Sequence, residues 1–279
     1  MPVVGPVTAP KPVAWRTLRF LGLMRRCALL LPAAVGVGAV GAALVGSGQS
    51  PSPSRPASEA APATRPETAP AAFVEFRTAD GHSLRGREYG IGGRWVILVH
   101  DEDQDSRAWG SLVRKLSTRG FRVLAFDRRG YGASEGPRNS RRAAADVSAA
   151  LRFARSRGAS GLYVVSAGAG ASAALVAAKA HRLRALIALS PRPARGPAIG
   201  PIPPETRAPK LIIVGALDER AGKAADAVFR RSVGWVVLNS PPVVVQGTAL
   251  LQSSWGDHVR EQIFAFLEDY FDPPPESPQ

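Results

Sequence analysis

The sequence predicts an α/β fold in which a mostly parallel sheet is covered by helices on both faces. Short, continuously apolar stretches alternate along the chain with longer stretches whose apolar residues recur at helical spacing. Strands without a polar face are typical of a parallel sheet buried on both sides, and the helices between them supply the crossovers. Alternating stretches on either side of Asp80-Gly81 predict, in addition, an antiparallel hairpin at one edge of the sheet.

The predicted elements follow one another between residues 73 and 271. Strands are predicted at residues 73–78, 83–89, 95–99, 121–126, 162–165, 183–189, 211–214 and 235–238. Helices are predicted at residues 109–116, 141–155, 171–180, 221–231 and 259–271. In such a sheet the ligand crevice lies beyond the carboxyl ends of the strands, so residues that follow strands are the candidates for chemistry.

The chain before this domain is expected to export it. Residues 1–26 carry arginines and no acidic residue, and residues 27–46 carry no charge. A run of this length just crosses a hydrocarbon core, and the positive charge before it holds its start in the cytoplasm. We expect a transmembrane anchor or the apolar part of a cleaved signal peptide, with Met1 or Met24 as the start. The domain is then held at the cell membrane outside the cytoplasm, or is secreted or periplasmic.

A spacer and a tail flank the predicted domain. Residues 47–71 consist largely of Ser, Pro and Ala, which bury too little apolar surface to order themselves. The folded domain is expected at residues 72–272, followed by a disordered proline-rich tail at residues 273–279. The single cysteine, Cys27, excludes an internal disulfide.

The formal net charge of +14 does not indicate nucleic-acid binding. The arginines of the domain are scattered singly and in pairs, without the clustered stripe, reader motif or interleaved aromatics that such binding needs. Attraction to an anionic membrane surface is the milder partnership that the charge favours. We expect no nucleic-acid partner and no cofactor.

A motif after the fourth predicted strand allows the fold to be named. Residues 121–136 end in Asp127, Gly130, Gly132 and Ser134, spaced as Asp-x-x-Gly-x-Gly-x-Ser. With the strand before it, this stretch resembles the α/β-hydrolase superfamily, most of all its dienelactone-hydrolase, serine-aminopeptidase and monoglyceride-lipase branches. The resemblance implies an eight-stranded, mostly parallel sheet and, in active relatives, a Ser–Asp–His triad in that order. The segment where relatives often insert a lid is short and rich in proline, so we expect no cap domain and an open crevice.

The nucleophile position is predicted to lack a side chain. Residues 162–175 have the pattern of a strand, a sharp turn and an Ala-rich helix, as a nucleophile elbow requires. Active relatives carry Gly-x-Ser-x-Gly at this turn, and the resemblance places Gly168 where the serine belongs, with Ala169 in the oxyanion region. A second register makes Ser166 the nucleophile, but Val164 is then too large for the position two residues earlier.

The acid position is kept and the base position is changed. Asp218 follows a predicted strand where relatives carry the triad aspartate, although an Asp there also caps helices. Gln246 stands where the His-Gly-Thr-x-Leu-Leu ending of relatives has its histidine, and glutamine has no proton that titrates near neutral pH. The nearest substitute base is His258, for which a capping or surface role is the other interpretation.

The oxyanion region departs as well. Relatives typically have His-Gly after this strand, whereas here His100 is followed by Asp101 and by three further carboxylates within residues 102–105. Negative charge in this loop has the wrong sign for stabilising an oxyanion.

The alternating acids of this loop also suggest a weak calcium candidate. Asp101, Asp103 and Asp105 match the opening of a calcium loop, but Ser106 replaces its glycine and Leu112 its final glutamate. The other interpretation is a solvated acidic loop in which Asp105 or Ser106 caps the next helix.

Three functions remain open on these grounds. The first is a pseudo-hydrolase that binds a small molecule or a protein at the open crevice. The second is an active ester or amide hydrolase that uses displaced residues, Ser166 with His258 or His100. The third is an interaction protein whose basic outer surface meets the partner. The joint departure of nucleophile, base and oxyanion loop favours the first.

Overall fold

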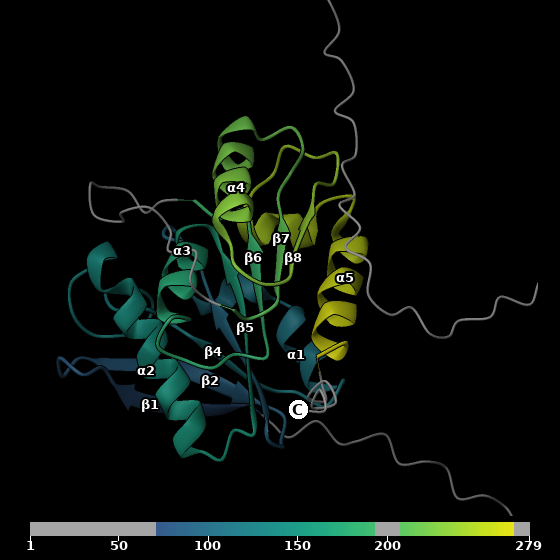
Figure 1. The fold of residues 1–279 in the computed structure, drawn as a ribbon. Helices are drawn as coiled ribbons and strands as arrows, with labels where there is room; N and C mark the ends of the chain where they lie inside the picture. The colour runs from purple at the N-terminus through teal and green to yellow at the C-terminus, as the bar shows by residue number, and fades with distance from the viewer. Residues whose placement is uncertain (1–70, 193–206, 271–279) are drawn as a thin grey trace, which may run out of the picture. The chain divides into compact units, whose positions relative to one another are not determined.

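The computed structural model describes residues 71–192 and 207–270 (Figure 1). The predicted basic start, the apolar run and almost all of the spacer lie outside the described residues, as do the tail and most of the segment expected to lack a cap. Among the helices that the structure describes, none combines the length and the hydropathy that a membrane span requires.

One sheet of eight strands forms the centre of the domain, in the order β1-β2-β4-β3-β5-β6-β7-β8. Its strands are β1 (Ala72–Arg77), β2 (Ser83–Tyr89), β3 (Arg94–Val99), β4 (Arg122–Phe126), β5 (Gly161–Ala167), β6 (Ala185–Leu189), β7 (Lys210–Ile213) and β8 (Val236–Asn239). Strand β2 pairs antiparallel with both β1 and β4, and all other neighbours are parallel. The predicted mostly parallel sheet with an antiparallel hairpin at its edge is therefore confirmed.

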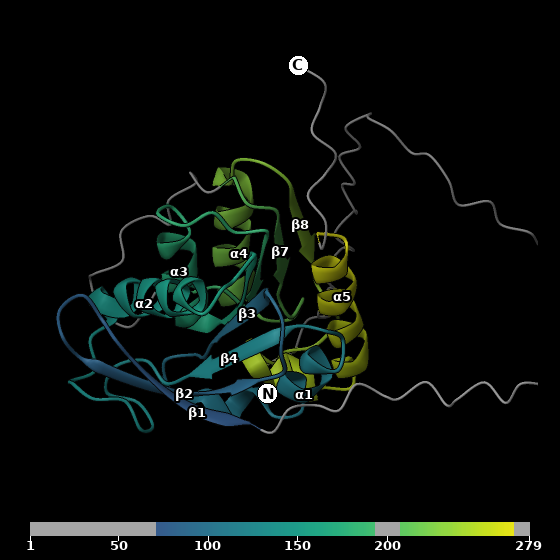
Figure 2. The same ribbon diagram turned by 90° about the horizontal axis from the view of Figure 1, so that it is seen from below.

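Helices cover both faces of this sheet. The α-helices are α1 (Leu112–Ser117), α2 (Ala143–Ser156), α3 (Gly168–Ala177), α4 (Glu219–Arg231) and α5 (Gly256–Glu268), and the 3₁₀ turns are η1 (Ser106–Trp109), η2 (Ser140–Arg142) and η3 (Gly247–Gln252). Helices α2, α3 and α4 lie on one face, and α1 and α5 lie on the other (Figures 1 and 2).

Each face has its own hydrophobic core because strand side chains alternate between the faces. In β3, Ile97 packs into the cluster beneath α2, α3 and α4, whereas its neighbour Leu98 packs into the cluster beneath α1 and α5. Strand β5 alternates in the same way, with Val164 in the first cluster and Val165 in the second. The central strands are thus buried on both sides, and only their carboxyl ends open to ligands.

Besides α5, which begins at Gly256 and not at the expected residue 259, two helix predictions were wrong at their starts. The helix expected at residues 109–116 is divided into η1 and α1, because Gly110 takes a positive φ of 50° and ends the first turn. Helix α3 begins at Gly168, three residues earlier than expected, since the sharp turn after β5 leads directly into helical backbone. The second difference matters for the site, because it places the turn's apex in the first helical position.

Candidate functional site

The motif at residues 127–134 builds a rigid turn beside the crevice rather than a reactive group. The two carboxylate oxygens of Asp127 accept hydrogen bonds from the backbone N–H groups of Ser106 (2.7 Å) and Ala133 (2.9 Å). A side chain on Gly132 would collide with the Asp127 carboxylate, which explains the glycine. The motif therefore ties the loop after β4 to the loop after β3.

The turn between β5 and α3 has the conformation of a nucleophile elbow. Gly168, at its apex, has a φ of +54°, which is strained for any residue with a Cβ. It is buried at the carboxyl end of β5, between the ends of β3 and β6. The structure thus places Gly168 at the apex of a sharp turn between a strand and a helix, the kind of turn that the resemblance implies for the nucleophile.

The carboxylate of Asp101 fills the space in front of this glycine. A Cβ on Gly168 would overlap the Cγ and both carboxylate oxygens of Asp101, which follows β3. A second glycine, Gly247, faces the same group, and a Cβ there would lie 3.5 Å from Asp101 Oδ2. An acidic side chain therefore fills the space in front of the turn's apex, where the resemblance implies the attacking hydroxyl of active relatives.

Asp101 also takes up the donors beside this turn, one of which, the N–H of Ala169, the resemblance assigns to the oxyanion region. Its Oδ1 accepts hydrogen bonds from the backbone N–H groups of Ala169 (2.9 Å) and Glu102 (2.6 Å). Arg192 donates to the same oxygen from Nη2 at 2.9 Å, and its Nη1 lies 3.7 Å from Glu102 Oε2. Three donors that favour a negatively charged oxygen thus already bind the carboxylate oxygen of Asp101.

Arg192 is a site residue that sequence reasoning missed. It lies just after β6, the neighbour of β5, and it neutralises part of the negative charge expected of the loop. Its position just beyond the carboxyl end of a predicted strand was the available signal. Ser190, two residues earlier, was missed as well: it has a φ of 46°, and its buried hydroxyl has no hydrogen-bond partner among the described residues.

Of the two roles considered for Asp218, the structure shows the helix cap. Asp218 is the N-cap of α4, because its Oδ1 accepts from the backbone N–H of Ala221 at 3.0 Å. Its Oδ2 is buried and has no hydrogen-bond partner in the described part of the chain. Oδ1 therefore caps the helix, and Oδ2 accepts no hydrogen bond from the described residues.

Gln246 lies at the surface, directly before η3, and its side chain makes no hydrogen bond within residues 71–192 and 207–270. The loop that carries it is joined to the loop after β3 by Thr248, whose hydroxyl donates to Gln104 Oε1 at 2.9 Å. The loop that carries Gln246 and the acidic loop after β3 are thus neighbours.

His100 is a buried structural residue. Its Nε2 accepts from the backbone N–H of Arg128 at 3.0 Å, and its Nδ1 then donates to the carbonyl oxygen of Asp101 at 2.7 Å. Burial, with a smaller contribution from the Arg128 charge, lowers the pKa of this imidazole to about 4. With both nitrogens engaged, His100 has none left to act as a base.

Acid is expected to destabilise the domain through His100. Its pKa of about 4 lies below the usual value near 6.5, so the unfolded chain takes up the proton first as the pH falls. The contribution of His100 to the free energy of unfolding is fully present above pH 6.5. It declines towards pH 4, by up to roughly 3 kcal/mol. Urea unfolding of the wild type and His100→Gln at pH 7 and pH 4.5 checks this. An equal loss in both proteins would show that His100 is not responsible.

The displaced residues of the second hypothesis are not brought together. Ser166 is fully buried in β5, and its hydroxyl donates to the carbonyl oxygen of Ile187 at 2.8 Å. His258 is exposed on α5, where its ring contacts Trp255 and its Nε2 lies 2.8 Å from Gln262 Nε2. Neither His258 nor His100 is hydrogen-bonded to the Ser166 hydroxyl.

The acids of the calcium candidate have separate partners. Asp101 meets Ala169, Glu102 and Arg192, whereas Asp105 caps η1 by accepting from the backbone N–H of Arg107 and also pairs with its guanidinium. In the part of the chain that the structure describes, no three His, Cys, Asp or Glu residues are grouped to hold a metal ion. The expectation that Asp105 or Ser106 caps a helix is met by Asp105.

The strand order, the elbow after β5 and the acid after β7 together define the superfamily. A family model described as serine aminopeptidase, S33, matches residues 93–227, from β3 into α4. The chain is a member of the α/β-hydrolase superfamily. In active members the nucleophile stands on a sharp turn between a strand and a helix, and Gly168 lies on a turn of this kind here.

Solved structures of this superfamily have a similar fold. An esterase from Pyrococcus furiosus superposes with a TM-score of 0.61 at 16% identity, covering 73% of this chain and 92% of that chain. An esterase from Thermogutta terrifontis gives 0.59 at 18% identity, covering 72% of this chain and 100% of that one. A structure described as a membrane phospholipase A and a bacterial virulence factor gives 0.59 at 15% identity, covering 73% and 87%. This α/β-hydrolase-fold protein is thus related to esterases by architecture.

Proposed function

We propose that this protein is an exported, catalytically inactive α/β-hydrolase that acts as a module for binding a small molecule or a protein. The observation that carries the proposal is the position of the Asp101 carboxylate. It overlaps the place of a side chain at position 168 and accepts the N–H of Ala169. Ester or amide hydrolysis needs a nucleophile and an empty oxyanion hole at these two places.

Each catalytic requirement fails for its own physical reason. Gly168 offers no oxygen, and Gln246 offers no group that exchanges a proton near neutral pH. The donor at Ala169, one of those that would stabilise a developing oxyanion, already faces a full negative charge. Since the loss of a single oxyanion donor costs about 2.7–4 kcal/mol of transition-state stabilisation, the three departures together support a non-catalytic role.

A reactive-serine test separates this proposal from hydrolysis by displaced residues. The folded, purified protein is treated with a fluorophosphonate probe and assayed with a short-chain nitrophenyl ester. We expect no label and no turnover above that of Ser166→Ala, because the Ser166 hydroxyl is buried and bonded to Ile187. Labelling at Ser166 that disappears in the variant, or at Ser190 by peptide mapping, would overturn the proposal.

Export is the second part of the proposal, and it is supported by the charge-free run at residues 27–46 after an arginine-rich start. The domain would be tethered at the outer face of the membrane if the run stays uncleaved, or released if it is cleaved. Alkaline phosphatase, which is active only outside the cytoplasm, is expected to be active when fused after residue 71. Deletion of residues 27–46 should abolish that activity, and activity that survives the deletion argues against export by this segment.

A further inference from the structure

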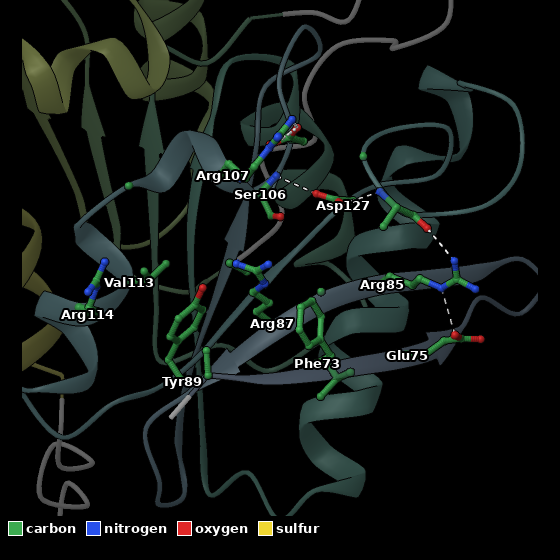
Figure 3. Close-up of a pocket in the computed structure, with 18 of the residues that line it drawn as sticks. Phe73, Glu75, Arg85, Arg87, Tyr89, Ser106, Arg107, Val113, Arg114 and Asp127 are labelled. Atoms are coloured by element: carbon green, nitrogen blue, oxygen red, sulfur yellow. Dashed lines mark hydrogen bonds and ion pairs between the residues drawn. The ribbon is translucent and has the colours of Figure 1, made fainter. Parts of the chain in front are cut away.

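The domain has a cavity of about 1080 Å³ that is separate from the crevice (Figure 3). One wall is formed by β1 and β2, and the opposite wall by η1 and α1. None of Asp101, Gly168, Asp218 and Gln246 lines it. Ligand pockets of drug-sized molecules have volumes of about 300–1,000 Å³, so this cavity is large enough to hold one.

The strand wall is an ordered array of arginine and aromatic side chains. Alternate residues of β2 point to the same side, which places Arg85, Arg87 and Tyr89 in one row. The register sets Phe73 opposite Arg87, and Glu75 opposite Arg85. Arg85 pairs with Glu75 at 3.1 Å, whereas the Arg87 guanidinium lies 4.6 Å from the centre of the Phe73 ring. Figure 3 shows Arg87 between Tyr89 and Phe73.

The carboxylates that line the cavity are already engaged. Glu75 accepts from Arg85, Asp105 pairs with Arg107, and Asp127 accepts from two backbone N–H groups. The lining therefore holds four arginines against three carboxylates, and each carboxylate has its partners within the domain.

Two of the four arginines have no acidic partner within the described part of the chain. The Arg87 guanidinium contacts the Phe73 ring, and neither Arg87 nor Arg114 on α1 forms an ion pair with any residue that the structure describes. Both are exposed, and they lie on opposite walls. The apolar surface beside them comes from Phe73, which is 81% exposed, together with Tyr89 and Val113.

We propose that this cavity binds an amphipathic anion, a small molecule with an aromatic or apolar body and one carboxylate, sulfonate or phosphate group. Arg87 and Arg114 supply the positive charge for the anionic group, and Phe73, Tyr89 and Val113 contact the body. A guanidinium group pairs well with planar or tetrahedral oxyanions, and aromatic rings beside it favour a flat apolar body. The site is independent of the crevice, so it would function whether or not the crevice is catalytic.

Calorimetric titration with 2-naphthoate tests the proposal, with the neutral 2-naphthalenemethanol as comparison ligand. We expect the wild type to bind the carboxylate and to bind the alcohol at least tenfold more weakly, since charged hydrogen bonds are lost. Arg87→Gln and Arg114→Gln should each weaken naphthoate binding about tenfold. The matched control is Arg231→Gln, which removes the same charge from an exposed position on α4 and should leave binding unchanged.

A second variant separates the apolar contact from the charge. Phe73→Ala should weaken both ligands and, because Phe73 is 81% exposed, it should not unfold the domain. The proposal is overturned by a wild type that does not bind naphthoate, by equal affinity for acid and alcohol, or by full binding in both arginine variants. Binding to vesicles rich in anionic lipid, without binding of free naphthoate, would replace it with a membrane-docking surface.

Discussion

Gly168→Ala is expected to lower the free energy of unfolding by roughly 2–6 kcal/mol, although it adds a single methyl group. One part of the cost is conformational, because φ at this position is +54° and a residue with a Cβ is strained there by about 1–3 kcal/mol. The other part is steric, because the added carbon overlaps the carboxylate of Asp101. Urea unfolding monitored by tryptophan fluorescence measures the sum.

The two parts can be separated with Asp101→Ala. In that background the carboxylate is gone, so Gly168→Ala should cost only its conformational part, and the double-mutant cycle should show coupling of more than about 1 kcal/mol. Gly222→Ala is the matched control: Gly222 lies inside α4 with open space around it, so alanine should be neutral or stabilising by up to about 1 kcal/mol. An identical cost of Gly168→Ala with and without Asp101 would show that Asp101 does not fill this space.

Esterase activity is expected to appear when the crevice is rebuilt by Asp101→Gly, Gly168→Ser and Gln246→His together. The first change empties the oxyanion hole and makes room for the second, which supplies the hydroxyl. The third supplies a base, whose second nitrogen can be oriented by the free Oδ2 of Asp218. Because general base catalysis contributes about 10²–10⁴-fold, turnover of a nitrophenyl ester should exceed that of the Asp101→Gly, Gly168→Ser protein by roughly 10²-fold.

Asp218→Asn, added to the three substitutions, is the control for that experiment. Asparagine caps helices as well as aspartate does, so the N-cap of α4 should survive while the orientation of the new histidine is lost. Activity should therefore fall in a protein that remains folded, as circular dichroism can verify. If the rebuilt protein shows no serine labelling, or if Asp218→Asn leaves its activity unchanged, these positions do not form the triad of the active relatives.

The sequence predicted which residue types stand at the candidate site, but not which contacts their side chains make. That position 168 has no hydroxyl and position 246 no imidazole follows from the residue types alone. That Asp218 Oδ2 lacks a hydrogen-bond partner among the described residues does not. The competing role of Ser166 could not be judged in this way. Its hydroxyl is bound to Ile187 on the neighbouring strand, a partner that exists only after β5 and β6 have paired.

Helix boundaries were predicted less well than strands. Most of the strands are buried on both faces, so their sequences are short, continuously apolar runs that are easy to recognise. The helix expected at residues 109–116 failed at Gly110, because a glycine within a helical pattern does not reveal whether its φ is positive. The cavity beside β2 depends in a similar way on pairing, since the contact between Phe73 and Arg87 arises from the register of two strands.

The sequence by itself determined the class of the fold, the order of its elements and the residue types at positions 168 and 246, because each of these follows from local patterns and residue types. The tertiary structure alone decided which side chain fills the space in front of Gly168. Asp101 reaches Ala169 across 68 residues of chain, and Arg192 reaches Asp101 across 91. Strands β3, β5 and β6 are neighbours in the sheet, so the residues after their carboxyl ends converge, although no local pattern links them.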